Sequence, residues 1–243
     1  MIKQAVILSA GFGTRMKDLT ANVPKPMLPL FGKPMLEWQI LFLKKLGIKQ
    51  FFINLHYKGN VIKDYFKSGK MLDVQIIYHH EDVIMGTGGA YMAFREELDD
   101  YFVAMNSDIF IDFISYDFLR HETEFGVACM ILKSYQEQNS YTPVYHQGNK
   151  LMAIGSSEKS DWGKGVFTGF QILSREIFDY LPDGPSSIIS NFYQPALKEG
   201  KDLRVLLNVK KWIDVGTKQD YLLFKKMINN EHFLKNRGGL YGT

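Results

Sequence analysis

Short apolar runs alternate with amphipathic stretches along the first half of the chain. The runs that predict strands lie at 5–8, 51–55, 74–78 and 102–105, and the stretches that predict helices lie at 35–46, 61–66 and 89–95. In the first of these helices Leu36, Ile40 and Leu43 recur at helical spacing, and Gly47 follows where a left-handed cap belongs. The alternation predicts crossover connections and a mostly parallel sheet, whose ligand crevice lies beyond the carboxyl ends of the strands.

The pattern changes after Gly126, where turn pairs such as Gly148-Asn149 separate short strands. The predicted strands of this half are 127–132, 143–146, 151–154, 166–173 and 203–209, and the predicted helices are 188–197 and about 218–228. We therefore expect a mixed and more antiparallel second half. The tail at 237–243 holds three glycines and is expected to be mobile.

Composition and charge set broad limits on the function. The chain of 243 residues shows no internal repeat or linker, which favours one α/β domain with a substrate-side lobe. Its 29 Lys and Arg residues exceed 26 Asp and Glu residues by only three, so neither nucleic acid nor an anionic membrane is expected as a partner unless charge is locally concentrated. The single Cys129 excludes an internal disulfide and has the apolar neighbours of a packed core thiol. No apolar run suits a secretion signal or a membrane span, so we expect a cytoplasmic protein.

A long segment without periodicity follows the first predicted strand. It contains Gly-Phe-Gly-Thr-Arg at 11–15 and Pro-Lys-Pro-Met-Leu-Pro at 24–29. Glycines let backbone N–H groups approach phosphate oxygens closely, and Arg15 and Lys25 can supply positive charge. Met16 breaks the dinucleotide-binding fingerprint and no Gly-Lys-Ser/Thr ending is present, so a dehydrogenase or a kinase is disfavoured. The plain alternative is that the glycines only turn the chain.

The residues at 11–15 and 24–29, with Thr20 between them, resemble the nucleotide-binding signature of the sugar-1-phosphate nucleotidylyltransferases. In that family a Pro usually stands three positions after the Arg, whereas Asp18 takes its place here. The resemblance extends from Met1 to about Ile228, and its motifs come in the family's order. It implies a Rossmann-like three-layer α/β/α fold, the nucleotide-diphospho-sugar transferase fold. A nucleotide-binding half would occupy about 1–125 and a sugar-phosphate-binding half about 126–230.

Two segments with carboxylates resemble the family's metal-binding elements. They are Asn-Ser-Asp at 106–108, where Ser107 replaces the usual glycine, and Trp-Ile-Asp-Val-Gly-Thr at 212–217. Asp108 follows an apolar strand, and a carboxylate there suits a hard divalent cation, although an isolated aspartate more often caps a turn. Thr217 and Asp220 have the spacing of a capping box for the last helix, which leaves the preceding carboxylate, Asp214, freer for chemistry.

Two further segments resemble the family's substrate-binding loops. Gly-Thr-Gly-Gly-Ala at 86–90 resembles the family's loop that binds the nucleobase. The alternative interpretation of this segment is a glycine-rich start of a helix with no role in binding. Glu-Lys at 158–159 and Thr-Gly at 168–169 resemble the lining of the sugar-phosphate site. Ser160 replaces the family's Pro there, and Lys164 is a rival for the acceptor phosphate.

The resemblance implies a role for each of these residues. The expected nucleotide-binding residues are Ala10, Gly11, Gly13, Thr14, Arg15, Lys25, Gly86, Thr87 and Gly88. The expected sugar-phosphate-binding residues are Asn106, Glu158, Lys159 and Gly169. The expected catalytic residues are Arg15, Lys25, Asp108 and Asp214, of which the two carboxylates would bind Mg²⁺.

The implied reaction joins a nucleoside triphosphate and a sugar 1-phosphate to give a nucleotide sugar and pyrophosphate. Its nucleophile is already an anion, and the sequence carries no zinc-enzyme or serine-hydrolase motif. Short members that are similar include N-acetylmuramate 1-phosphate uridylyltransferases and mannose- or heptose-1-phosphate guanylyltransferases. The base, the acceptor and the oligomeric state stay open. The alternatives are a cytidylyltransferase for a non-sugar phosphate such as phosphocholine, and a nucleotide-sugar sensor without turnover.

Overall fold

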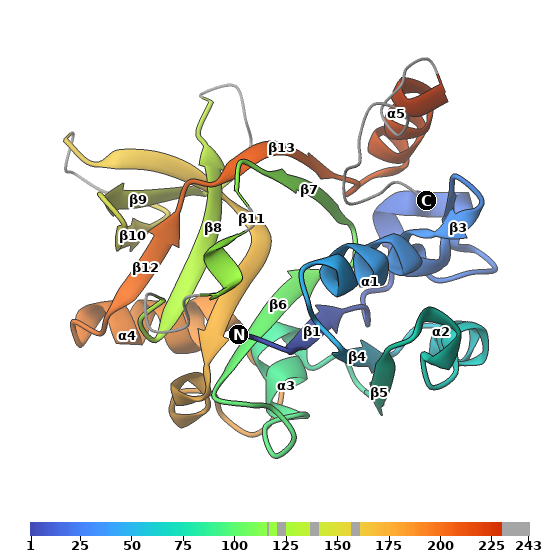
Figure 1. The fold of residues 1–243 in the computed structure, drawn as a ribbon, viewed down its shortest axis with the longest axis horizontal. Helices are drawn as coiled ribbons and strands as arrows, with labels where there is room; N and C mark the ends of the chain where they lie inside the picture. Colours follow the sequence, from blue (N-terminus) through green and yellow to red (C-terminus); the bar gives the residue numbers. More distant parts are fainter. Residues whose placement is uncertain (116, 121–124, 137–140, 157–160, 230–243) are drawn as a thin grey trace.

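A nine-stranded mixed sheet forms the centre of the computed structural model, which describes residues 1–115, 117–120, 125–136, 141–156 and 161–229 (Figure 1). The strand order is β5-β4-β1-β6-β11-β8-β12-β10-β9. The strands are β1 (Gln4–Leu8), β4 (Gln50–Leu55), β5 (Gln75–His80), β6 (Tyr101–Asn106), β8 (Ala128–Ser134), β9 (Pro143–Gln147), β10 (Lys150–Ile154), β11 (Gly163–Ser174) and β12 (Leu203–Leu206).

Pairing in the sheet changes from parallel to antiparallel between β6 and β11. The first four strands, β5, β4, β1 and β6, are all parallel. β11 then runs antiparallel to both β6 and β8, and β9 and β10 pair antiparallel with each other. The predicted change between a parallel first half and a more antiparallel second half is therefore confirmed.

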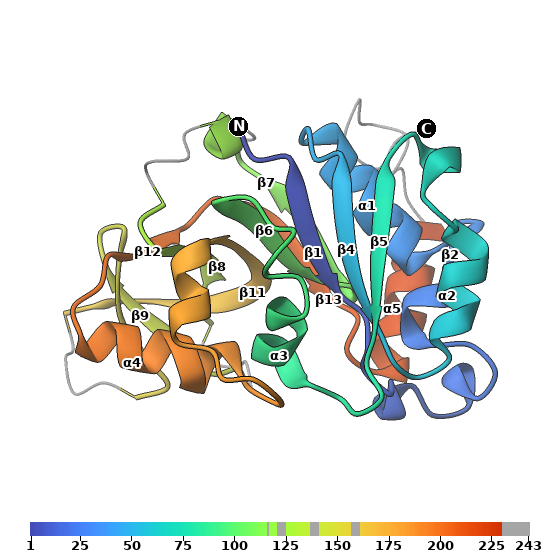
Figure 2. The ribbon, with the colours of Figure 1, turned by 90° about the horizontal axis from the view of Figure 1, so that it is seen from below.

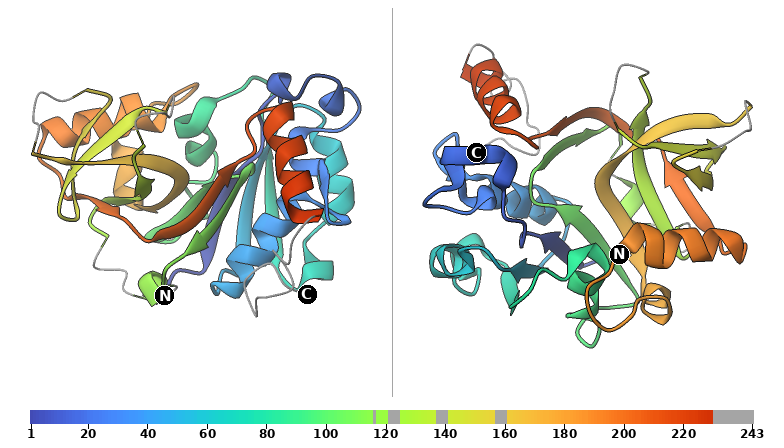
Figure 3. Two further views of the ribbon diagram at one scale, coloured as in Figure 1. Left: turned by 90° about the horizontal axis from the view of Figure 1, so that it is seen from above. Right: turned by 180° about the vertical axis from the view of Figure 1, so that it is seen from behind.

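Helices cover both faces of this sheet, as Figures 2 and 3 show. α1 (Met35–Lys45) and α2 (Gly59–Phe66) pack on one face, and α3 (Gly86–Met92) and α4 (Gln194–Lys198) pack on the other. Alternate strand residues serve the two cores because successive side chains point to opposite faces, so Ile7 lies in one core and Val6 in the other. The three-layer α/β/α fold is confirmed.

Several element boundaries differ from the predicted ones. α3 begins three residues before the predicted helix at 89–95, because Gly86 to Gly88 already belong to it. The predicted helix at 188–197 is a π-helical turn (Ile189–Tyr193) followed by α4. Short helical turns occupy Thr14–Thr20, Lys25–Met27, Lys70–Leu72, Asp117–Arg120 and Arg175–Asp179, and a small hairpin joins β2 (Pro29–Leu30) to β3 (Lys33–Pro34).

A separate antiparallel ribbon joins β7 (Ile109–Phe113) to β13 (Val209–Asp214). The sequence pattern predicted one strand at 203–209, whereas the structure divides this stretch between β12 and β13. Asn208 lies at the break and anchors it to Ser115, because its side chain accepts a hydrogen bond from the Ser115 N–H at 3.0 Å and donates one to the Ser115 carbonyl at 2.6 Å. The chain therefore leaves the main sheet and pairs with β7.

The last described helix, α5 (Lys218–Asn229), begins with the predicted capping box. The Thr217 N–H donates to Asp220 Oδ2 at 2.8 Å, and the Asp220 N–H donates to Thr217 Oγ1 at 3.2 Å. Tyr221 and Phe224 pack on a third core that also holds Met16. The predicted mobile tail lies outside the described residues, and within the described part no helix is long and apolar enough to cross a membrane.

Candidate active site

A cavity of about 420 Å³ opens beyond the carboxyl ends of β1, β4 and β6. This is the edge at which the parallel strands were expected to place a ligand crevice. Eight of the nine predicted nucleotide-binding residues line it: Ala10, Gly11, Gly13, Thr14, Arg15, Lys25, Gly86 and Thr87. Asn106 and Asp108 line it as well, so the structure brings residues from four separate segments of the chain to one cavity.

Contacts with neighbouring segments hold the loop at residues 9–15 in place. Gly13 has a φ of +65°, which favours glycine, and a Cβ there would lie 3.1 Å from Lys25 Cβ, so a larger residue would crowd Lys25. The Thr20 hydroxyl donates to the Gly13 carbonyl at 3.2 Å, and Met16 is fully buried in the third core. These contacts fix the backbone that faces the cavity.

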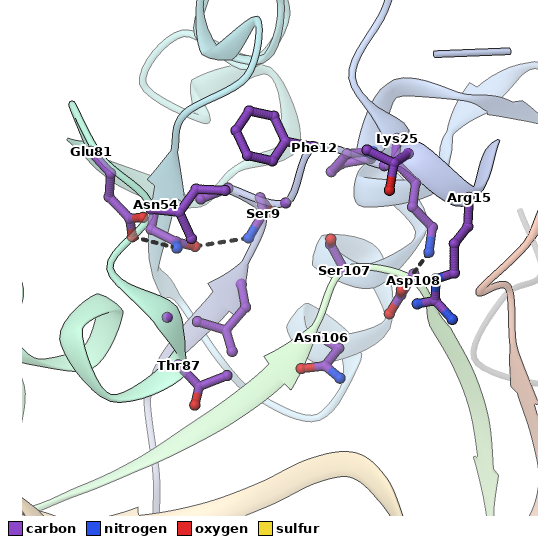
Figure 4. A pocket seen from close by; sticks show the side chains of 18 of the residues that line it. Ser9, Phe12, Arg15, Lys25, Asn54, Glu81, Thr87, Asn106, Ser107 and Asp108 are labelled. Carbon is purple, nitrogen blue, oxygen red and sulfur yellow. Dashed lines mark hydrogen bonds and ion pairs between the residues drawn. The ribbon is translucent and has the colours of Figure 1, made fainter. Parts of the chain in front are cut away.

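Positive charge gathers at one end of the cavity, where Arg15 and Lys25 lie beside Asp108 (Figure 4). Lys25 is buried, and its Nζ lies 2.5 Å from Asp108 Oδ2. A buried ammonium needs such a partner because burial without one is costly. An arriving phosphate group would therefore meet an ordered cation at this end.

Asp214 reaches the same end through the pairing of β13 with β7. It stands opposite Ile109, and the Val215 N–H donates to the Asp108 carbonyl at 2.9 Å. Burial raises the pKa of the Asp214 carboxyl, and the nearby Asp108 carboxylate raises it further, against the opposing effects of Lys25 and Arg15. The two predicted metal-binding carboxylates are thus close enough to interact, although Asp214 is not part of the cavity wall.

The donor set at this end fits a magnesium ion. Within the described residues no cluster of three or more His, Cys, Asp or Glu side chains could hold a metal, so a metal here would have the two carboxylates of Asp108 and Asp214. Mg²⁺ is commonly bound by one or two carboxylates, with substrate phosphates and water completing an octahedron. The assignment of Asp108 and Asp214 to a metal stays a prediction.

A buried carboxylate, Glu81, lies at the opposite end of the cavity, and sequence reasoning did not find it (Figure 4). It is 2% exposed. Asn54 Nδ2 donates to its Oε1 at 2.7 Å and the Met85 N–H donates to its Oε2 at 2.9 Å, while Asn54 Oδ1 accepts from the Ser9 N–H at 2.8 Å. Both Asn54 and Glu81 stand at the ends of apolar parallel strands, which is the signal that could have found them.

The glycines at 86–88 pack against another loop as well as facing the cavity. Gly86 has a φ of +69°, and a Cβ there would lie 2.5 Å from the Ser186 carbonyl oxygen. Gly88 does not line the cavity, because it faces Ser186 Oγ, which a Cβ would approach to 2.5 Å. Thr87 lines the cavity, and its Oγ1 accepts from the Ile188 N–H at 2.9 Å. The role of Gly88 is thus best explained by packing.

The predicted sugar-phosphate residues are only partly described. Gly169 has a φ of +81° and supports Asn106, whose Nδ2 would lie 2.7 Å from a Cβ at position 169. Glu158 and Lys159 lie outside the described residues. Lys164, the alternative candidate to bind the acceptor phosphate, lies over the Tyr145 ring, with its Nζ 5.9 Å from the ring centroid, and does not line the cavity.

An aromatic pair adjoins Asp214 on this side, and sequence reasoning did not find it. The Tyr141 hydroxyl donates to Asp214 Oδ2 at 3.3 Å, and its ring centroid lies 5.0 Å from that of Trp212. Trp212 in turn donates from Nε1 to the Thr168 carbonyl at 2.9 Å. Burial, and then the Asp214 carboxylate, raise the pKa of Tyr141 to about 12, so its hydroxyl remains a donor.

Several known proteins with similar sequences carry names that describe them as sugar-1-phosphate nucleotidylyltransferases. D-glycero-alpha-D-manno-heptose 1-phosphate guanylyltransferase of Campylobacter jejuni is 32% identical over 228 residues, covering 93% of this chain and 100% of that protein. The mannose-1-phosphate guanylyltransferase catalytic subunit beta of Dictyostelium discoideum is 30% identical, and a UTP--glucose-1-phosphate uridylyltransferase of Synechocystis is 28% identical. Both matches cover 90% of this chain but only 62% and 61% of those longer proteins.

Solved structures agree in fold, and a family model agrees in sequence. HddC from Yersinia pseudotuberculosis has a TM-score of 0.76 at 24% identity, covering 93% of this chain and 100% of that chain. The inositol-1-phosphate CTP transferase from T. maritima has a TM-score of 0.74 at 14% identity, covering 95% and 97%. The family model described as Nucleotidyl transferase matches residues 4–231. With the match along the full Campylobacter enzyme, this shows that the chain belongs to the nucleotidyl transferase family and is a sugar-1-phosphate nucleotidyltransferase.

Proposed function

We propose that this chain transfers a guanylyl group from GTP to the phosphate of a manno-configured sugar 1-phosphate and releases pyrophosphate. The observation that carries the choice of base is the buried Glu81 carboxylate at the end of the cavity away from Lys25 and Asp108. The cationic end suits the phosphates, which leaves the Glu81 end for the nucleobase.

Glu81 favours guanine by its hydrogen-bonding capacity. An ionised carboxylate only accepts hydrogen bonds, and its two oxygens offer about four acceptor sites. Asn54 and the Met85 N–H use one site on each oxygen, so each oxygen retains another. Guanine presents two neighbouring donors, N1–H and the N2 amino group, whereas uracil presents one N–H between two carbonyl oxygens. Guanine is therefore the base that this carboxylate complements best.

The names of the similar proteins support the acceptor. The Campylobacter protein, which this chain matches over its full length, is named for a manno-heptose 1-phosphate, and the Dictyostelium protein is named for mannose 1-phosphate. Both are guanylyltransferases by name, which agrees with the base inferred from Glu81. A manno-configured acceptor is the simplest substrate class that joins these two names.

The reaction needs alignment and charge stabilisation more than proton transfer. An oxygen of the acceptor phosphate attacks the α-phosphorus of GTP, a new P–O bond forms, and the bond to the β-phosphate bridging oxygen breaks, so that pyrophosphate leaves with the electron pair. Holding the two anions in line can lower the barrier by up to about 7–11 kcal/mol. Arg15 and Lys25 line the cavity where charge develops and would stabilise it.

Asp108 and Asp214 would hold Mg²⁺, which acts as a Lewis acid on phosphoryl oxygens. In the chain itself, Lys25 neutralises Asp108, and Tyr141 donates a hydrogen bond to Asp214. These contacts keep two neighbouring carboxylates in place although they repel each other. The acceptor nucleophile is already ionised, so no side chain has to remove a proton from it.

Pyrophosphate release tests this proposal directly. The purified chain would be incubated with Mg²⁺, each of GTP, UTP, CTP, ATP and dTTP, and a panel of mannose, manno-heptose, glucose and N-acetylmuramate 1-phosphates plus phosphocholine. We expect release with GTP and a manno-configured sugar 1-phosphate. Release with UTP alone would refute the choice of base, and release with phosphocholine alone would refute the sugar acceptor. Silence across the panel, with no nucleotide raising the melting temperature, would refute the assignment of the cavity.

A further inference from the structure

A second cavity, of about 720 Å³, lies between the segment that follows β1 and helix α5. We call it the outer groove. It is lined by four cationic side chains, Arg15, Lys17, Lys218 and Lys226, together with the apolar Leu222 and Leu223. Segments about 200 residues apart in the sequence thus form one basic groove, which sequence reasoning did not find.

The outer groove concentrates charge that the chain as a whole lacks. The whole sequence carries a net charge of only +3, whereas four cations line this one groove. Lys218 pairs with Asp18, at 2.6 Å from Oδ1 and 2.9 Å from Oδ2. Among the residues that the structure describes, neither Lys17 nor Lys226 forms an ion pair with a carboxylate. The groove therefore retains a strong positive excess, which is the local concentration that the overall composition did not indicate.

The walls of the groove are held together. The Asp18–Lys218 pair joins the segment after β1 to α5, and it places the aspartate that departs from the family's proline in an ion pair. Lys17 has a φ of 56° and a ψ of −126°, a conformation that is rare for a residue with a side chain. The Thr20 hydroxyl shares its single proton between the Lys17 carbonyl, at 3.1 Å, and the Gly13 carbonyl, at 3.2 Å, and so helps to hold this backbone in place. Backbone strain of this kind persists where the surroundings enforce it, so the backbone at Lys17 is held in place and its exposed side chain starts from a fixed point.

The outer groove adjoins the active-site cavity at one residue, Arg15. Arg15 lines both cavities, and among the described residues it alone is shared between them. The apolar side chains of Leu222 and Leu223 lie beside these cations and are 43% and 56% exposed, so the groove is open to an arriving anion. An anion that leaves the active site past Arg15 would thus meet three further cations, Lys17, Lys218 and Lys226.

We propose that the outer groove is a second anion site, which binds the pyrophosphate released by the reaction. This inference rests on the proposed function, because that reaction supplies the pyrophosphate. A site beside the active site would draw the product away from Lys25 and Asp108. By the same affinity it would concentrate pyrophosphate for the reverse reaction.

The test compares a charge-removing double variant with a matched control. Lys17→Ala/Lys226→Ala removes the two cations that form no ion pair, and Lys225→Ala removes the neighbouring lysine of α5, whose Nζ lies over the Tyr221 ring at 5.9 Å. Inhibition of the forward reaction by pyrophosphate and the KM for pyrophosphate in the reverse reaction would be measured. Loss of two exposed charge contacts should raise both constants about fivefold or more. The control should stay within about twofold of the wild type, by the same reasoning for a charge outside the groove.

A charge-preserving variant and a binding measurement complete the test. Lys17→Arg/Lys226→Arg should restore the wild-type constants, because the groove needs charge at both positions. Calorimetric titration of pyrophosphate into the protein without other substrates should show weaker or fewer binding events in the alanine double variant. Unchanged pyrophosphate binding in that variant, in an enzyme that turns over normally, would overturn the outer groove alone. If the alanine double variant binds pyrophosphate more weakly but the wild-type chain shows no turnover, the proposed function is overturned, whereas the assignment of the outer groove as an anion site is kept.

Discussion

Glu81→Gln tests the assignment of guanine with a change of one atom. The substitution keeps the size of the side chain but replaces one acceptor oxygen by an amino group that donates. Asn54 Nδ2 and the Met85 N–H both donate to Glu81, so the amide oxygen can satisfy only one of them at its original position. Whichever way the amide turns, guanine loses a charged acceptor and one of its two donors meets a weaker or absent partner.

The expected loss follows from the strength of a hydrogen bond to a charged group. Such a bond contributes about 1.5–3 kcal/mol, which corresponds to a fall of about 10- to 150-fold in kcat/KM for GTP. Uracil carries both a donor and acceptors on its edge, which an amide can complement. We therefore expect kcat/KM for UTP to fall less than that for GTP, or to rise, so that the ratio of the two moves toward UTP.

The assay is the initial rate of pyrophosphate release with each nucleotide at a fixed concentration of sugar 1-phosphate. Asp82→Asn is the matched control, because it removes the same charge at the next residue, which is exposed. Thermal unfolding of both variants separates lost recognition from lost stability, since Glu81 also ties β5 to Asn54. An equal fall for every nucleotide would refute base recognition by Glu81, and so would a GTP rate within about twofold of the wild type.

Three further predictions follow from the same contacts. Asp108→Asn should abolish Mg²⁺-dependent turnover while the chain still folds, as its circular dichroism spectrum would show, but with a lowered melting temperature, because the buried Lys25 ammonium keeps only a neutral amide oxygen as its partner. Tyr141→Phe should keep the ring contact with Trp212 but weaken Mn²⁺ binding about two- to fivefold, measured by electron paramagnetic resonance without substrates, because Asp214 loses a neutral donor. Burial raises the pKa of Cys129 to about 12, so its thiol is protonated at pH 8 and should react with a thiol reagent only after unfolding.

Much of the fold could be predicted because its first half follows local rules. Apolar runs and helical spacing placed β1, β4, β5 and β6 and the helices between them. The nucleotide loop could be placed as well, since the carboxyl ends of parallel strands meet at one edge of the sheet. The Arg15 and Lys25 side chains lie at that edge for this reason. Their individual roles stay predictions.

The sequence could not predict contacts between distant segments, because no local spacing of residues indicates which segments meet. Asn54 and Glu81 are 27 residues apart, and only the pairing of β4 with β5 brings their side chains together. The β7–β13 ribbon was missed because its strands pair across about 100 residues, and Asn208, at the break between β12 and β13, is anchored to the distant Ser115. The outer groove was missed for the same reason, since its lysines come from opposite ends of the chain.

One short segment near the end of the described chain connects these sites. The backbone leaves the main sheet at Asn208, and β13 then pairs with β7 and brings Asp214 beside Asp108. Six residues after Asp214 the capping box is complete, and it starts α5 so that Lys218 meets Asp18. Asp214 and one wall of the outer groove are therefore positioned by the same stretch of backbone. Asp18, which stands where the family usually has a proline, forms the ion pair that joins the segment after β1 to α5, so this departure has a structural explanation.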